Sequence, residues 1–307
     1  MLRRLIRNPK DDQHKEESES KNADSQNEGS AEEKSAKVTM AKEYTEILDE
    51  QLQVAIREHK RSWKGLLLSG TTAGLEIGFS IFLMGIVWTL FHNELSEEVL
   101  HLWLALSYPL GFIFVVIGRS ELFTEHTNLA VLPVLDKQVS FKSLMVLWSC
   151  IFGGNLIGGY IFSFILTEVG PALGIISPDA FVYLAEKMTA FSSEIILVSA
   201  ILAGWLMGLL SWLVTSSSDS ISRIFVVVLV TAVIGFGNLH HSIVGSIEVF
   251  SGMLIGNSIS VLDYLQFQLF TTLGNTLGGV FFVAVLKYSH SRYVEKKEEE
   301  HEQKNEG

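Results

Sequence analysis

The sequence has little of the chemistry on which most enzymes and metalloproteins depend. It contains a single cysteine, Cys150, which lies in an apolar run. One cysteine excludes a disulfide framework and a cysteine-based metal site. The chain also lacks a nucleotide-binding loop, a G-x-S-x-G nucleophile motif and an H-E-x-x-H zinc motif. These absences argue against an enzyme and against ATP-driven pumping within this chain, and they predict no cofactor.

Basic residues are also too few and too scattered to suit nucleic acid. The chain has 34 acidic and 23 basic residues and a net charge of −11, with no basic patch. Much of the charge lies in residues 1–41 and 288–307, which we expect to be disordered cytoplasmic tails because they contain too little apolar surface to fold. The basic start MLRRLIRNPK precedes no apolar segment, so we expect no cleaved signal peptide.

Long apolar runs fill the chain between these tails, over residues 63–287. A helix needs about 20 residues to cross the hydrocarbon core of a bilayer. Five runs are long enough for one crossing each: 65–91, 99–118, 143–167, 194–214 and 264–287. Residues 42–62 instead place apolar side chains at helical spacing between charges, which predicts an amphipathic cytoplasmic helix. That helix would lie on the membrane face, against a neighbouring subunit, or simply on the surface.

The region 224–256 differs, because the polar residues NLHHS (238–242) interrupt it. Each flanking apolar segment spans about 14 residues and would rise only about 21 Å, too little to cross. We therefore expect one interrupted span, and six crossings in an all-α membrane protein. Lys and Arg gather in the loops and flanks that six crossings place on one side. By the positive-inside rule, this predicts a multi-pass protein of the cell (inner) membrane with both termini in the cytoplasm.

Two short motifs occur twice in the same order. A-G-x-x-x-G occurs at 73–78 and 203–208, and G-N-x-x-G-G at 154–159 and 274–279. The halves 63–167 and 193–287 then have three crossings each, and an odd number makes them inverted relative to each other. Chance recurrence of small-residue packing motifs is the alternative. The repeat predicts a second break at GRSELFTEHTN (118–128), followed by a short re-entrant half-helix at 129–135.

Two facing breaks would form one polar site within the membrane. A helix that restarts there points its N-terminal N–H groups at the site, which favours an anion or a small polar solute. The polar residues at the breaks are Thr124, Glu125, His126, Thr127, Asn128, Asn238, His240, His241 and Ser242. A neutral histidine there could donate a hydrogen bond, exchange a proton with a weak-acid anion, or merely satisfy an open backbone carbonyl. We expect no metal, because adjacent His240 and His241 point about 100° apart on a helix.

The motifs ELFT (121–124) and HSI (241–243), with six spans and an A-G-x-x-x-G opening, resemble the formate/nitrite transporter family over about residues 42–287. The resemblance implies an aquaporin-like inverted repeat with interrupted second and fifth helices, assembled as a homopentamer in the lipid bilayer. Each protomer would pass small monovalent weak-acid anions or their neutral acids, often with a proton.

The resemblance also implies roles for single residues. It places the central pore histidine at His241, the loop threonine at Thr124, and constriction residues at Leu122 and Phe123. A lysine that attracts anions falls on Lys187, for which a lysine at the membrane edge is the alternative. Asn238, His240 and Ser242 complete the expected pore at the second break.

The chain departs from the family pattern around both breaks. Arg119 and Ser120 precede ELFT in place of Gly and a small residue, and Glu125-His126 follow it in place of Gly-Asn. His240 stands where the family has a glutamate, and Gly245 where it has an asparagine. Glu76 and Glu248 are acids within apolar spans, which are rare without a partner or a pathway. Arg119 could pair with Glu121 or Glu125. These changes indicate a divergent member with another substrate.

We therefore expect a channel-like carrier of small weak-acid anions. The anion would be drawn in by Lys187, pass a constriction that includes Phe123, and gain a proton near His241 and Thr124. A pore for a neutral solute, such as water or ammonia, is the second hypothesis. The third is a non-conducting membrane scaffold that binds a partner through its N-terminal tail. Flux that survives deletion of residues 1–40 would exclude the third.

Overall fold

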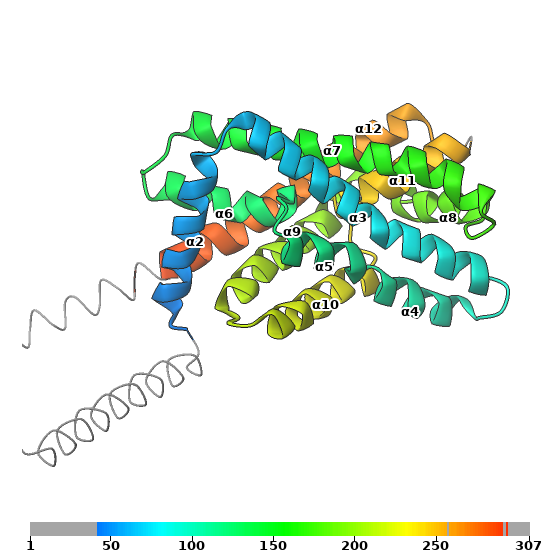
Figure 1. Cartoon of the computed structure of the whole chain (residues 1–307), viewed down its shortest axis with the longest axis horizontal. Coiled ribbons are helices and arrows are strands. Elements are labelled where there is room, and N and C mark those ends of the chain that lie inside the picture. The colour runs from blue at the N-terminus through cyan, green and yellow to red at the C-terminus, as the bar shows by residue number, and fades with distance from the viewer. Residues whose placement is uncertain (1–41, 257, 291–292, 294–307) are drawn as a thin grey trace, which may run out of the picture. The chain divides into compact units, whose positions relative to one another are not determined.

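The five long apolar runs are helical in the computed structural model, which describes residues 42–256, 258–290 and 293. They form α3 (Trp63–Phe91), α4 with α5 (Glu97–Ser107 and Pro109–Gly118), α7 (Phe141–Ala172), α9 (Ser193–Ser216) and α12 with the π-helix η1 (Val261–Leu277 and Gly278–Val285) (Figure 1). All five are long and apolar enough to cross a membrane, and the last runs on to His290. The described residues form helices and no strand, so the protein is an all-α membrane protein.

The chain divides into two compact units, Met1–Lys42 and Glu43–Gly307. The expectations for residues 1–41, and for 291–292 and 294–307 at the other end, lie outside the described residues. The helices and sites below all belong to the second unit.

Both middle helices are interrupted, as the internal repeat predicts. In the first half, α5 ends where Arg119 adopts a φ of 60°, and α6 (Phe123–Leu135) starts four residues on. In the second half, α10 (Ser220–Phe236) and α11 (Val244–Ile255) flank residues 237–243. The helices α6, α10 and α11 have 13, 17 and 12 residues, and each is too short to cross a bilayer alone.

The first break is shorter than the sequence suggested. We expected it to extend over 118–128, but Thr124–Asn128 already belong to α6. The carbonyl of Leu122 accepts the backbone N–H groups of Glu125 at 3.1 Å and His126 at 3.0 Å, which starts the helix there. The irregular backbone is therefore limited to residues 119–122.

The outer helices of the two halves pack in the same way. α3 lies along α7, and α9 along α12 and η1. Glycines of the repeated motifs allow this close approach, because a Cβ added to Gly158 would lie 2.0 Å from the carbonyl oxygen of Thr71. A Cβ on Gly278 would likewise lie 2.0 Å from the carbonyl oxygen of Ile201. A side chain at either position would force the helices apart.

The asparagine of the first G-N-x-x-G-G motif ties the first break to its neighbours. The side-chain amide of Asn155 donates to the carbonyls of Gly70 and Glu121, both at 2.9 Å. Its Oδ1 accepts the backbone N–H of Phe123 at 2.8 Å. The bonds to Glu121 and Phe123 satisfy backbone groups that the interruption of the helix would leave unpaired, and the bond to Gly70 ties them to α3.

The asparagine of the second motif repeats this arrangement. Asn275 donates to the carbonyls of Ala200 at 2.8 Å and His240 at 3.0 Å, and it accepts the N–H of Ser242 at 2.7 Å. We call Asn155 and Asn275 the clamp asparagines. Their matching bonds give the repeated motif a physical role, which is to hold each break in one shape.

Two further helices lie beside these spans. α2 (Tyr44–His59) packs against α6, α7 and α9 and buries Ile47, Leu48, Gln51, Leu52 and Ala55. Its apolar side therefore faces the helices of its own chain. α8 (Pro178–Thr189) follows α7 and packs mainly against α11.

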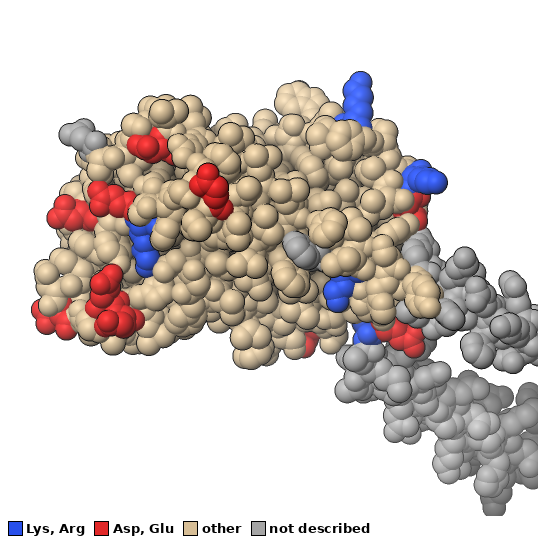
Figure 2. All heavy atoms as spheres, turned by 180° about the vertical axis from the view of Figure 1, so that it is seen from behind, with Lys and Arg blue, Asp and Glu red and all other residues tan. Residues whose placement is uncertain are grey.

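Basic and acidic side chains separate along the second unit. On the face in Figure 2, most Lys and Arg lie toward one end and most Asp and Glu toward the other. The separation follows from the loops, since residues 92–98 and 257–263 contain acids but no Lys or Arg.

Candidate functional site

A hydrogen bond joins the second break to the helix that follows the first break. The imidazole Nε2 of His241, in the second break, lies 2.8 Å from the hydroxyl oxygen of Thr124, in the first turn of α6. Both side chains are buried, with 1% and 0% of their surface exposed. The structure thus brings together two of the residues expected to line the pore.

The hydrogen bonds at Nδ1 of His241 determine which ring nitrogen carries the proton. The backbone N–H groups of Ile243 and Val244 both donate to Nδ1 at 3.3 Å. Nδ1 therefore acts as an acceptor, and the proton is assigned to Nε2, which donates to Thr124. Phe112 meets the ring edge-on, with centroids 5.4 Å apart. His241 is held as a neutral ring in one orientation.

A cavity of about 30 Å³ opens beside His241, which is about the space of one water molecule. The helices α4, α8 and α10 and the second break supply most of its wall, and α11 adds Glu248. The polar and ionisable residues that line it are His101, Tyr108, Lys187, Asn238, His241 and Glu248. Three of the expected pore residues, Lys187, Asn238 and His241, thus share one cavity.

Lys187 projects from the last turn of α8 into this cavity. Its Nζ lies 3.1 Å from Nδ1 of His101 and 5.9 Å from the centre of the Tyr183 ring. Burial lowers the pKa of Lys187, while the carboxylates of Glu248 and Glu97 oppose that shift. A half-buried cation at this position creates a local attraction for anions.

His240 lies elsewhere, although it neighbours His241 in the chain. Its Nδ1 and backbone N–H both bond to the hydroxyl of Ser199, at 2.8 and 3.1 Å. Its Nε2 lies 3.2 Å from the carbonyl oxygen of Met188. His240 is absent from the cavity wall, and its contacts match the alternative of a histidine that satisfies a backbone carbonyl.

The other expected residues of the second break have distinct positions. Asn238 adopts a φ of 46° and lines the cavity. Ser242 gives its backbone N–H to Asn275, and its carbonyl accepts from Gln268 at 3.3 Å. Its hydroxyl is buried and has no partner among the described residues.

Leu122 and Phe123 close the first break with apolar side chains. They are 0% and 4% exposed. The ring of Phe123 packs against Phe152 and Trp148, with centroids 5.0 and 6.2 Å apart. This packing makes a solid apolar layer at the point where α6 begins.

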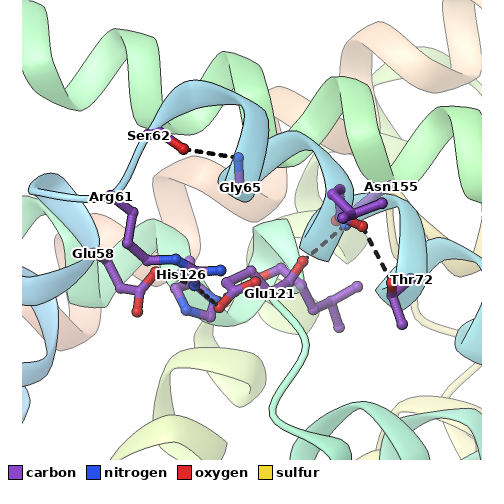
Figure 3. Close-up of polar contacts among 10 residues, drawn as sticks. Glu58, Arg61, Ser62, Gly65, Thr72, Glu121, His126 and Asn155 are labelled. Carbon is purple, nitrogen blue, oxygen red and sulfur yellow. Dashed lines mark hydrogen bonds and ion pairs between the residues drawn. The ribbon is translucent and has the colours of Figure 1, made fainter.

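An ion pair connects the first break to the segment before α3. Arg61 reaches from the linker after α2 and pairs with Glu121 of the break and with Glu58 at 2.7 Å (Figure 3). We expected Arg119 to pair with Glu121 or Glu125, but Arg61 is the residue that pairs with Glu121. Arg119 ends α5 in the left-handed region and its side chain is exposed, while Glu121 is buried.

The remaining unusual residues near the first break are engaged locally. The hydroxyl of Ser120 donates to the carboxylate of Glu76, which joins the break to α3. Nδ1 of His126 lies 3.1 Å from the carbonyl oxygen of Leu122. Among the residues that the structure describes, no group of three or more His, Cys, Asp or Glu side chains is placed to bind a metal ion.

Sequence reasoning missed several residues of the site. The sequence showed the clamp asparagines as part of the repeated motif, but it did not show that their side chains form hydrogen bonds to the backbone. Glu248 stood out as an acid in an apolar span and was not assigned to the pore. Nothing in the local sequence of His101 or Arg61 pointed to the cavity or to the first break.

Comparisons with known proteins agree on one family. A family model described as formate/nitrite transporter matches residues 45–289. The inner membrane protein YfdC of Escherichia coli (strain K12) is 30% identical over 239 residues, which are 77% of this chain and 75% of that protein.

Two solved structures share the fold. One, described as an FNT family ion channel, has a TM-score of 0.72 at 22% identity and covers 80% of this chain and 99% of its own. Another, described as a pentameric formate channel with formate bound, has a TM-score of 0.62 at 20% identity, with coverages of 74% and 96%. At these identities the likeness establishes the architecture.

Proposed function

Because the chain belongs to the formate/nitrite transporter family, we propose that it carries small monovalent weak-acid anions across the cell membrane through a pore in each protomer, together with a proton. The observation that supports this most directly is the cavity that joins Lys187 to His241. We infer one path from half-buried Lys187, through this cavity, to His241 and its hydrogen-bond partner Thr124.

The order of residues along this path suggests how an anion crosses. Lys187 attracts it into a cavity that has room for about one water molecule, so it loses most of its hydration there. A bare anion is costly in an apolar layer such as Leu122 and Phe123, whereas a neutral acid is not. The anion therefore gains a proton near His241 and Thr124 before it passes that layer.

The family suggests the oligomeric state of the protein, and the distribution of charge suggests its orientation in the membrane. One structural relative is described as a pentameric channel with formate bound, and we infer a homopentamer for this chain as well. The separation of basic and acidic residues supports cytoplasmic termini. Formate and nitrite are the first anions to test, although the residues around both breaks depart from the family pattern.

The test uses purified protein in liposomes that contain a pH-sensitive dye. Formate, nitrite, hydrosulfide, acetate and lactate are added in turn at an external pH of about 5.5 and about 7.5, on either side of the imidazole range. We expect the interior to acidify faster than in empty liposomes, and faster at the lower pH. His241→Asn should change this rate about tenfold, the effect of one hydrogen bond of about 1.4 kcal/mol.

His92→Asn provides the matched control. His92 stacks on Trp88 at the end of α3 and is not part of the cavity wall, so its loss should leave the rate unchanged. Equal rates for wild type and His241→Asn would remove His241 from the path, and a wild type no faster than empty liposomes would contradict anion transport.

A pore for a neutral solute is the second candidate, and Glu248 is the observation that favours it. This buried carboxylate lines the same cavity, where it would oppose an anion that stays charged. Solute flux that is insensitive to membrane potential and moves no protons would support this candidate.

A further inference from the structure

Glu248 is the one buried acid of the cavity, and the pathway above gives it no role. It lies in the second turn of α11 after the break, and its side chain is only 3% exposed. It shares the cavity wall with Lys187 and His241. In the part of the chain that the structure describes, its carboxylate forms no hydrogen bond, and Lys187 is the nearby charge that acts on it.

The groups that face Glu248 come from several elements. α8 contributes Lys187, α4 contributes His101, the junction of α4 and α5 contributes Tyr108, and the break contributes His241. α3 adds only the apolar Met84 to this wall. From α7 and α12, Tyr160 and Tyr264 reach α11, but their hydroxyls bond to each other, and that of Tyr264 also bonds to Ser246. One cation and one carboxyl group therefore set the charge of the cavity.

His241 is poorly placed to supply a proton. In its neutral form Nε2–H already donates to Thr124, and Nδ1 already accepts from the N–H groups of Ile243 and Val244. A second proton on Nδ1 would point at those two N–H groups and leave both without an acceptor. The ring therefore serves as a fixed donor to Thr124, and the proton must come from another group.

Building on the proposed function, we propose that the Glu248 carboxyl group donates the proton that an entering anion takes up, and that its carboxylate form excludes anions that cannot be protonated. The step is balanced: the O–H bond of the carboxyl group breaks, a new O–H bond forms on the anion, and Glu248 becomes a carboxylate beside Lys187. A hydronium ion from the outer solution then restores the carboxyl group. Lys187 holds the anion and stabilises the carboxylate in turn.

Glu248→Gln separates this role from a structural one, because glutamine has nearly the same shape but neither donates a proton in this way nor carries charge. In the dye-loaded liposomes, we expect acidification by formate to fall about tenfold and to lose its dependence on external pH. Influx of nitrate, the anion of a strong acid, should rise about tenfold because a repelling charge is gone. Glu248→Asp, which keeps the carboxyl group, should keep the pH dependence.

Glu186→Gln is the matched control, since Glu186 is an exposed acid on the same helix as Lys187; it should behave as the wild type. If Glu248→Gln does not fold, Glu248→Ser repeats the test. Unchanged formate and nitrate fluxes in a folded variant would overturn the inference and leave the proposed function standing, as would an equal loss of both fluxes. A wild type that responds to no weak acid would overturn both.

Discussion

Single residues decide the shape of both breaks, and the clamp asparagines show this most clearly. Asn155 pairs three buried backbone groups through one side chain. Asn155→Ala would leave the carbonyl of Glu121 and the N–H of Phe123 unpaired, because the carbonyl of Gly70 also accepts within α3, and each unpaired group costs about 1–3 kcal/mol. We expect a fall in stability of about 2 kcal/mol or more, seen as a lower unfolding temperature in detergent. Asn93→Ala, at an exposed loop residue, is the control, and an equal effect of both changes would show that Asn155 is not a clamp.

For single residues, the sequence predicts the polar character of the breaks better than it predicts where each side chain points. The adjacent residues His240 and His241 indicated a polar break. Helical spacing could not predict which of the two rings enters the pore, because the backbone there is not helical. The structure turns His241 to Thr124 and His240 to Ser199. Lys187, His241 and Glu248 lie in different segments, so only the packing of α8 against α11 brings them to one cavity.

At the scale of elements, the contact between α3 and α7 depends on where glycine occurs. Gly158→Ala would place a methyl group 2.0 Å from the carbonyl oxygen of Thr71. We expect a loss of about 1–3 kcal/mol, typical of overpacking, and a lower unfolding temperature. Gly153→Ala in the same helix is the matched control, because a Cβ there meets nothing within 4 Å. It should stabilise α7 by about 0.5–1 kcal/mol; destabilisation by both changes alike would mean that close approach is not the cause.

The sequence predicted the helices better than it predicted the orientation of single side chains. Run length identified the five long spans, and a central polar interruption identified the broken one, because bilayer thickness sets a sharp length requirement. The extent of the first break was misjudged, since polarity alone does not stop a helix. Thr124–Asn128 are polar but helical, because their backbone groups bond within α6 and their neighbours are protein.

For the whole molecule, the distribution of charge predicts the orientation in the membrane. In a Cys150→Ser background, which removes the only native thiol, a membrane-impermeant maleimide should label Asn93→Cys on intact cells. Gln138→Cys, in the loop between α6 and α7, should be labelled only after the cells are permeabilised. The reverse pattern would place both termini outside and contradict the positive-inside interpretation.

The number of subunits is a separate prediction at this scale. Helices of the second unit expose large apolar side chains such as Trp63, Phe164 and Leu229, which must meet lipid or another subunit. From its structural relative we expect a mass of five chains, each of 34.1 kDa, for the solubilised protein after correction for bound detergent. A stable mass of one, two or three chains would contradict the pentamer. The composition of the chain gives no five-fold signal, so this expectation depends entirely on the relative.

The backbone contacts at Gly158 and Gly278 have a consequence for the motions that are open to the protein. Carriers that work by alternating access rock one repeat against the other. Here each glycine contact joins the two outer helices of one half, and each clamp asparagine ties the break of that half to the same two helices. We therefore expect each half to move as a rigid body. Any change of shape during transport then occurs between the halves, where α10 packs against α5 and α11 packs against α7.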